Sequence, residues 1–161
     1  ERYTERRQPI EKNSEDVIDK PGAPRTDFFH YKWRDTEKSL RALVDASAAF
    51  DRFDGFLLEY RHPVTNGPTM TTIQCAMQLL PAGRETDSHR HTSTVMYHVF
   101  RGSGSTEIGE RRFDWEQGDS FVVPLWHNQR HVNHSPWDEA MLFSMSDAPM
   151  LKALDLYREE S

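Results

Sequence analysis

Histidine is the residue type in this chain whose spacing points most directly to chemistry. The stretch SHRHTSTVMYHVFRGSG, residues 88–104, holds His89 and His91 two positions apart and His98 seven positions further on. Side chains two apart on a strand share a face and lie about 6–7 Å from each other, so His89 and His91 could bind one ion together. Neutral imidazole is a ligand for zinc, iron and copper. Two polar residues on a solvated strand face are the competing interpretation, and a third ligand would decide between them.

We expect the third ligand in a later polar stretch, GDSFVVPLWHNQRHVN, residues 118–133. Its residues Gln129, His131 and Asn133 are two apart and therefore share one strand face. Imidazole nitrogen is a stronger ligand for iron than amide oxygen, which favours His131. His98 has the opposite parity to His91, so we interpret it as an interface or surface residue.

The elements that must position these residues are short extended runs. They cover residues 55–61, 69–80, 92–101, 105–109, 111–115, 120–124 and 139–146, and turn-forming residues such as VTNGP, PAG, GSG and EQGD separate them. Many short strands with regular turns are typical of an all-β sandwich or barrel. We therefore predict an antiparallel jelly-roll barrel over about residues 55–146.

Two helices and an arm complete the predicted organisation. From Asp35, the run DTEKSLRALVDAS places Leu40, Leu43 and Val44 at helical spacing. At the other end, SDAPMLKALDLYREE offers Ser146 or Asp147 as an N-cap, which predicts a C-terminal helix over about 148–158 packed on the barrel. Residues 1–34 are charged, contain several prolines and read as an arm, and residues 35–161 form a single domain.

Strand parity also predicts which side chains face inward. If His89 and His91 face the interior, Tyr97 does so too, either as a substrate contact or as a core residue. The outward residues then include an unusually apolar set. Large exposed apolar patches are uncommon on monomers, so we expect another subunit, the arm or a lost domain to cover this face, and we predict a homodimer or larger homo-oligomer. The set is Met77, Leu79, Met96 and Phe100.

Composition limits the class of protein and of partner. The chain has 161 residues, a formal net charge of −6 and one cysteine, and it contains no block of Lys and Arg. A basic footprint for nucleic acid is therefore missing, and a small molecule is the expected partner. The sequence shows no signal peptide and no apolar run long enough for a membrane, so we expect a cytoplasmic protein without a membrane partner. Its start at Glu1 leaves the length of the native chain open.

Two stretches carry a resemblance to a known family. GRETDSHRHTSTVMYHVFRG resembles the first motif of the cupin superfamily, and GDSFVVPLWHNQRHVN is similar to the second. From LRALV through NGPTMTTIQCAMQLLPAG to FSMSDAPMLKALDLYREE, the chain looks like gentisate 1,2-dioxygenases and their relatives that act on salicylates and hydroxynaphthoate. The resemblance covers about residues 35–160 and is greatest to the second, C-terminal, of their two cupin halves.

The resemblance implies a double-stranded β-helix with Fe(II) held by three histidines. It implies cleavage of an aromatic ortho-hydroxy carboxylate, such as gentisate or a substituted salicylate, by O₂ between the carboxyl-bearing and hydroxyl-bearing carbons. His89 and His91 match the first two ligands, and spacing from Pro124 puts Gln129 at the third. His131 then matches a pocket histidine, so either residue could be the third ligand.

Two further positions follow from the same resemblance. Gln78 matches a glutamine that lines the family's pocket, and Val95 stands where many cupins have a glutamate, a loss shared with the gentisate group. The resemblance thereby assigns catalysis to His131 and Gln78 and substrate contact to Gln78, and strand parity adds Tyr97 as a substrate contact. A non-catalytic cupin half or binding module is the alternative, because Gln129 replaces a histidine. A cupin isomerase or sensor is a third class.

Overall fold

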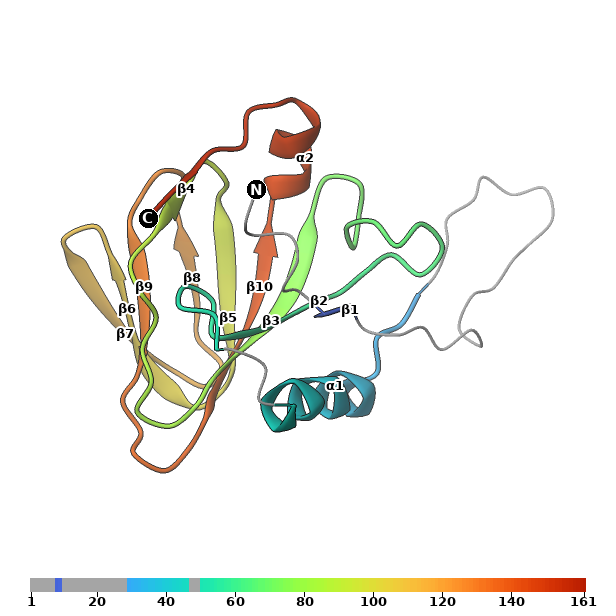
Figure 1. Ribbon diagram of the computed structural model, residues 1–161. Coiled ribbons are helices and arrows are strands. Elements are labelled where there is room, and N and C mark those ends of the chain that lie inside the picture. Colours follow the sequence, from blue (N-terminus) through green and yellow to red (C-terminus); the bar gives the residue numbers. More distant parts are fainter. Residues whose placement is uncertain (1–7, 10–28, 47–49) are drawn as a thin grey trace.

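The computed structural model describes residues 8–9, 29–46 and 50–161 (Figure 1). Strands make up most of the regular secondary structure of the described chain, with one helix before the barrel strands and one after them. In chain order the elements are β1 (Gln8–Pro9), α1 (Trp33–Asp45), β2 (Phe56–Glu59), β3 (Gln74–Leu80), β4 (Arg90–His91), β5 (Val95–Arg101), β6 (Ser103–Ile108), β7 (Arg111–Glu116), β8 (Ser120–Val123), β9 (Gln129–Asn133), β10 (Ala140–Ser146), α2 (Ala148–Ala153) and β11 (Glu159–Glu160).

The strands form two facing sheets and a small ribbon. The larger sheet has the order β1-β2-β3-β10-β5-β8, the smaller has the order β7-β6-β9, and β11 pairs with β4. All of these pairs are antiparallel except β1 with β2. Figure 1 shows the smaller sheet packed opposite β5 and β8. The prediction of an all-β barrel is confirmed.

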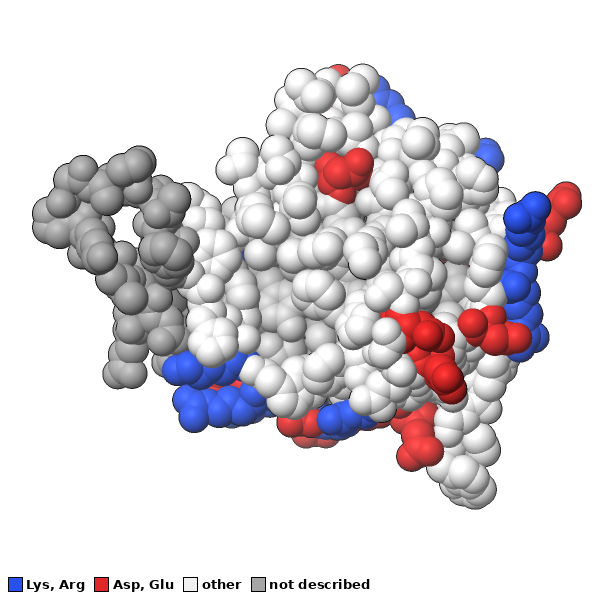
Figure 2. All heavy atoms as spheres, turned by 180° about the vertical axis from the view of Figure 1, so that it is seen from behind, with Lys and Arg blue, Asp and Glu red and all other residues white. Residues whose placement is uncertain are grey.

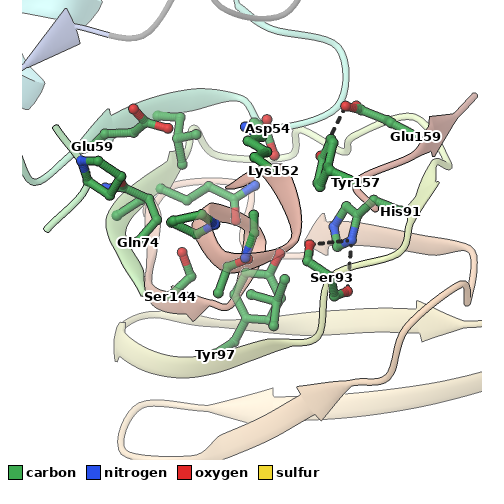
Figure 3. A pocket seen from close by; sticks show the side chains of 18 of the residues that line it. Asp54, Glu59, Gln74, His91, Ser93, Tyr97, Ser144, Lys152, Tyr157 and Glu159 are labelled. Atoms are coloured by element: carbon green, nitrogen blue, oxygen red, sulfur yellow. Dashed lines mark hydrogen bonds between the residues drawn. The ribbon is translucent and has the colours of Figure 1, made fainter. Parts of the chain in front are cut away.

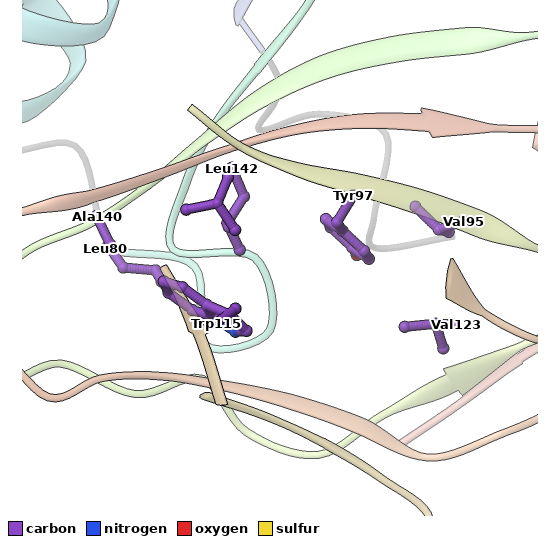
Figure 4. Close-up of a cluster of buried hydrophobic side chains, with 8 residues drawn as sticks. Leu80, Val95, Tyr97, Trp115, Val123, Ala140 and Leu142 are labelled. Carbon is purple, nitrogen blue, oxygen red and sulfur yellow. The ribbon is translucent and has the colours of Figure 1, made fainter. Parts of the chain in front are cut away.

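Alternation along β5 separates the interior of the barrel from its outer face. Val95, Tyr97 and Val99 are buried, whereas Met96 between them is 41% exposed. This is the inward parity expected for Tyr97. Facing side chains from the two sheets close the core, which Figure 4 shows as a cluster between the sheets. The cluster contains Leu80, Val95, Tyr97, Val99, Trp115, Val123, Ala140 and Leu142.

Helix α1 covers the outer face of the larger sheet. It buries Leu40 completely, and Leu40 joins Met77, Leu79 and other apolar side chains of the sheet in a second core cluster. Phe100 packs against the same cluster and lies 4.3 Å, centroid to centroid, from the ring of Trp33.

The prediction that an exposed apolar face covers this side of the sheet is therefore wrong. Of its four residues only Met96 is exposed, because the helix of the same chain covers the remainder. The sequence pattern revealed the helix but not the sheet face on which it packs. The homodimer remains a prediction, but an exposed apolar face no longer supports it.

The C-terminal helix is shorter than expected. Helix α2 ends at Ala153, and Asp155 adopts a positive φ of 55°, which turns the chain away from the helical path. The following residues run as β11 beside β4, so Leu154 stays 62% exposed and does not pack on the barrel. Helix α1 in turn begins at Trp33, two residues before the expected start.

The arm expected over residues 1–34 lies mostly outside the described residues. Of its described part, Gln8–Pro9 pairs in parallel with β2, which adds a strand at the edge of the larger sheet.

On the face seen in Figure 2, charged side chains of both signs lie mostly along the lower and right margins, and the middle of the face is largely uncharged. Within the part of the chain that the structure describes, no helix has the length and apolarity needed to span a bilayer.

The packing of α1 predicts a large effect of truncation at Leu40. Leu40→Ala removes a side chain with no exposed surface and should lower the free energy of unfolding by about 2–5 kcal/mol. Urea unfolding followed by circular dichroism measures the change. Leu154→Ala, at an exposed position, is the control and should change stability by less than about 0.5 kcal/mol. Equal effects of the two substitutions would show that α1 does not stabilise the sheet.

Candidate active site

A cavity of about 520 Å³ opens into the barrel between the larger sheet and the C-terminal segment (Figure 3). Its wall combines polar side chains with a smaller number of apolar ones. The lining residues are Asp54, Leu57, Glu59, Arg61, Pro68, Thr71, Gln74, Ala76, Gln78, His89, His91, Ser93, Val95, Tyr97, Ser144, Ser146, Ala148, Pro149, Lys152, Ala153, Tyr157 and Glu159.

His89 and His91 both face the amide of Gln129. His91 belongs to β4, and His89 just before it forms an isolated bridge with Gln129 at the start of β9. The amide Nε2 of Gln129 donates to Nε2 of His91 at 3.0 Å and to Nε2 of His89 at 3.3 Å. Two buried imidazole lone pairs thus share one donor group.

Neighbouring groups fix this arrangement. The Tyr97 hydroxyl donates to Oε1 of Gln129 at 3.3 Å, which is consistent with the amide nitrogen facing the histidines. Nδ1–H of His91 donates to the carbonyl of Ser93 at 2.9 Å, which leaves the Nε2 lone pair directed at Gln129. A second imidazole nitrogen held by a carbonyl in this way is the usual support of a metal-binding histidine.

Burial favours the neutral form of His91 and of His131. Burial lowers the pKa of His91, and the neighbouring His89 lowers it further. Burial lowers the pKa of His131 to about 3, with a further contribution from His89. Neutral imidazole is the form that binds metal ions, so the lowered pKa of His91 favours metal binding at that residue.

The structure does not bring His131 together with the other two histidines as a ligand. Among the described residues no group of three or more His, Cys, Asp or Glu side chains is placed to hold a metal ion. Nδ1 of His131 lies 2.8 Å from the Thr106 hydroxyl, which also accepts a hydrogen bond from the indole of Trp115. His131 does not line the cavity, and its ring packs edge-on against Tyr97 at 4.7 Å.

Gln78 lines the cavity with an amide group that has unused hydrogen-bonding capacity. Its side chain is 2% exposed, and within the described chain its Nε2 has no hydrogen-bond partner. A buried amide nitrogen without an acceptor is costly, and a bound ligand with an oxygen at this point would remove the cost. Tyr97 also lines the cavity, so both residues assigned to substrate contact from the sequence lie where a ligand could touch them.

Sequence reasoning missed several cavity residues. Glu59 lies on β2 two residues after Leu57 and so shares its inward face, and a charge at an inward position was the signal available. Lys152 and Tyr157 come from the C-terminal segment, where a continuous helix was expected. Tyr157 stacks on His91 with ring centroids 6.3 Å apart.

The donor set fits a divalent cation after one local change. If the Gln129 amide turns end for end, its Oε1 faces the two imidazole nitrogens and its NH₂ can donate to Tyr97. Two imidazoles and one oxygen then converge, which resembles the two-histidine, one-carboxylate set that binds non-haem Fe(II), with a neutral amide oxygen in place of the carboxylate. In the structure as it stands, the amide NH₂ occupies the place that a cation would take between the two histidines.

The comparison with known families identifies the barrel. The Cupin domain family matches residues 76–145. These residues form a cupin domain. This confirms the resemblance drawn from the two motifs, and the cupin match covers Gln78, His89, His91, Gln129 and His131.

Relatives of this cupin are named as dioxygenases. It is 37% identical over 133 residues to 5-aminosalicylate 1,2-dioxygenase of Comamonas sp, covering 83% of this chain and 35% of the relative. It is 34% identical over 158 residues to gentisate 1,2-dioxygenase of Haloferax sp, covering 96% of this chain and 42% of the relative. The chain thus spans less than half the length of these relatives.

A solved structure agrees with these sequence relatives. Salicylate 1,2-dioxygenase from Pseudoaminobacter salicylatoxidans, as its gentisate adduct, superposes on this cupin with a TM-score of 0.72 and 30% identity. The match covers 81% of this chain and 36% of that one.

The hydrogen bonds behind His131 give a second prediction. Thr106→Val keeps the shape of the side chain but leaves the Trp115 indole N–H and Nδ1 of His131 without their partner. The free energy of unfolding should fall by about 1–3 kcal/mol, because buried polar groups are then unsatisfied. Thr72→Val, at an exposed position, is the matched control and should be nearly neutral in the same denaturant titration. A neutral Thr106→Val would mean that these bonds do not hold His131.

Proposed function

We propose that this cupin is a domain of an Fe(II)-dependent ring-cleaving dioxygenase for an aromatic ortho-hydroxy acid of the gentisate or salicylate type. The observation that carries the proposal is the convergence of His89 and His91 on one point beside a cavity of about 520 Å³. The likeness to 5-aminosalicylate and gentisate 1,2-dioxygenases supports the reaction class.

His89, His91 and the amide oxygen of Gln129 would hold the iron. When bound there, Fe(II) would supply open coordination positions for the carboxylate and hydroxyl of the acid and for O₂. All three protein ligands are neutral, and Val95 adds no carboxylate, so the doubly charged cation favours a dianionic chelating substrate. Cleavage between the carboxyl-bearing and hydroxyl-bearing carbons is the reaction that such a chelate implies.

The remaining residues bind and orient the acid. The Gln78 amide nitrogen donates to a substrate oxygen, which satisfies a group that lacks a partner in the described chain. Tyr97 holds the Gln129 amide and presents its ring to the cavity wall. His131 stays neutral behind Tyr97 and supports that ring, because its Nδ1 is engaged by Thr106.

A second candidate function is a non-catalytic cupin half that binds an aromatic acid without iron. The hydrogen bonds of Gln129 favour it, since the amide NH₂ already satisfies both imidazole lone pairs. In this case Gln129 excludes a cation, and the catalytic centre of the whole protein would lie elsewhere.

Iron retention separates the two candidates. After anaerobic incubation with Fe(II) and gel filtration, the wild type should retain about one iron per chain by elemental analysis, as expected for a mononuclear site. His89→Ala should lose it, whereas His98→Ala should keep it, because His98 is bonded to Ser120 away from the cavity. Turnover of gentisate and salicylate is followed in parallel by oxygen consumption.

Two further variants identify the third ligand. Gln129→His should raise iron affinity if Gln129 occupies the third position, since imidazole is the stronger ligand. His131→Ala should abolish iron retention only if His131 is the ligand, and should otherwise leave iron bound. A wild type without iron, combined with a Gln129→His variant that acquires it, would establish the non-catalytic half instead.

A further inference from the structure

The C-terminal segment forms one wall of the cavity. After α2 the chain turns at Asp155, where φ is 55°, and returns as β11 beside β4, the strand that carries His91. We call residues 154–160 the clasp. Its residues Tyr157 and Glu159 line the cavity, and Figure 3 shows both on the same side of it as His91. The clasp therefore lies directly beside a candidate metal ligand.

The clasp has few apolar contacts to hold it. Leu154 is 62% exposed and Leu156 is 55% exposed. The structure describes every residue of the clasp, and none of them is buried. Strand β11 is two residues long, and the ion pair between Arg90 and Glu160 is exposed, so neither contributes much. Such a segment opens locally at a small cost in free energy unless other bonds hold it.

Three hydrogen bonds join Thr92 to the clasp. Its backbone N–H donates to the carbonyl of Arg158 at 3.0 Å, and its hydroxyl donates to the carbonyl of Leu156 at 3.0 Å. The same hydroxyl accepts a hydrogen bond from the backbone N–H of Arg158 at 2.9 Å. These partners stand on either side of Tyr157 in the chain, so Thr92 fixes the backbone that carries the tyrosine ring.

The tyrosine ring in turn packs on His91. The two rings lie 6.3 Å apart, centroid to centroid, at an interplanar angle of 24°. The Tyr157 hydroxyl donates to Oε2 of Glu159 at 3.1 Å, and Nζ of Lys152 lies 4.7 Å from the centre of the tyrosine ring. Packing against this ring and the hydrogen bond at Nδ1 together restrict the His91 imidazole. A displaced clasp would remove the first of these restraints and open the cavity wall.

We propose that Thr92 is a positioning residue that latches the clasp over the cavity, so that an acid bound beside His91 leaves only after the clasp opens. Thr92 does not line the cavity and therefore acts through Tyr157. The inference rests on the proposed function for the nature of the ligand, an aromatic acid. Because release passes through the open form, weakening the latch raises the rate of release by the same factor as the population of the open clasp.

Hydrogen exchange without ligand tests the latch. Thr92→Val keeps the branched shape and the backbone N–H but removes both bonds of the hydroxyl. Amide exchange in the clasp, measured by mass spectrometry, should become at least about fivefold faster, the factor that one hydrogen bond of ordinary net strength supplies. Exchange in β10 should not change. Thr92→Ser retains the hydroxyl and should restore the wild-type rate, and Thr72→Val is the control at an exposed threonine.

Release of gentisate tests the role of the latch in the site. Protein loaded with gentisate under nitrogen, with and without Fe(II), is diluted in a stopped-flow instrument, and the fluorescence of gentisate follows its release. Thr92→Val should release gentisate at least about fivefold faster, by the same factor as it speeds exchange, and Thr92→Ser should behave as the wild type. A threonine that only stabilised the fold would change unfolding but not release from the folded protein.

Variants of Tyr157 test whether Thr92 acts through the tyrosine ring. Tyr157→Leu removes the ring from His91 and should also speed the release of gentisate. Tyr157→Phe keeps the ring and loses the hydroxyl, so it should release gentisate more slowly than the leucine variant does. Equal rates for the two variants would overturn the part played by the ring.

The outcomes separate this inference from the proposed function. Gentisate binding with a release rate that Thr92→Val does not change, or clasp exchange that it does not change, overturns the latch and leaves an acid-binding cupin in place. A wild type that binds neither gentisate nor salicylate overturns the proposed function and this inference with it.

Discussion

The antiparallel pairing of β10 with β3 on one side and β5 on the other determines where both the core and the cavity form. The register places Leu142 level with Gln78 and Val99, and Ser144 level with Ala76 and Tyr97. Because side chains alternate between faces, a slip of one residue would move every inward side chain to the outer face. The core cluster and the inner wall of the cavity therefore depend on the same hydrogen-bonded ladders.

The second constraint is the burial of imidazole groups inside the barrel. His91 and His131 lie where solvent cannot stabilise a positive charge, which explains the lowered pKa of both residues. The side-chain amide of Gln129 donates hydrogen bonds to both cavity histidines, which pairs their buried Nε2 atoms without a positive charge.

Prediction from sequence was best where the pattern was local. Alternation over 92–101 identified Tyr97 as inward and Met96 as outward, because the two faces of a strand are decided by the backbone alone. The two motifs led to the cupin superfamily for a similar reason, since their histidines, glycines and proline stand at fixed spacings within short segments. The partner of the outer sheet face was missed, because amphipathic spacing shows that α1 has an apolar side but not what it covers.

The sequence by itself determined the class of barrel and the shared face of His89 and His91. It narrowed the partner of these histidines to Gln129 or His131 and left that choice open. Only the tertiary structure decided that Gln129 meets them, through the bridge between His89 and Gln129. It also placed Glu59 at the far end of the cavity. These facts depend on the register between strands distant in the chain, and such registers arise from packing the whole barrel, whereas side-chain alternation arises within a single strand.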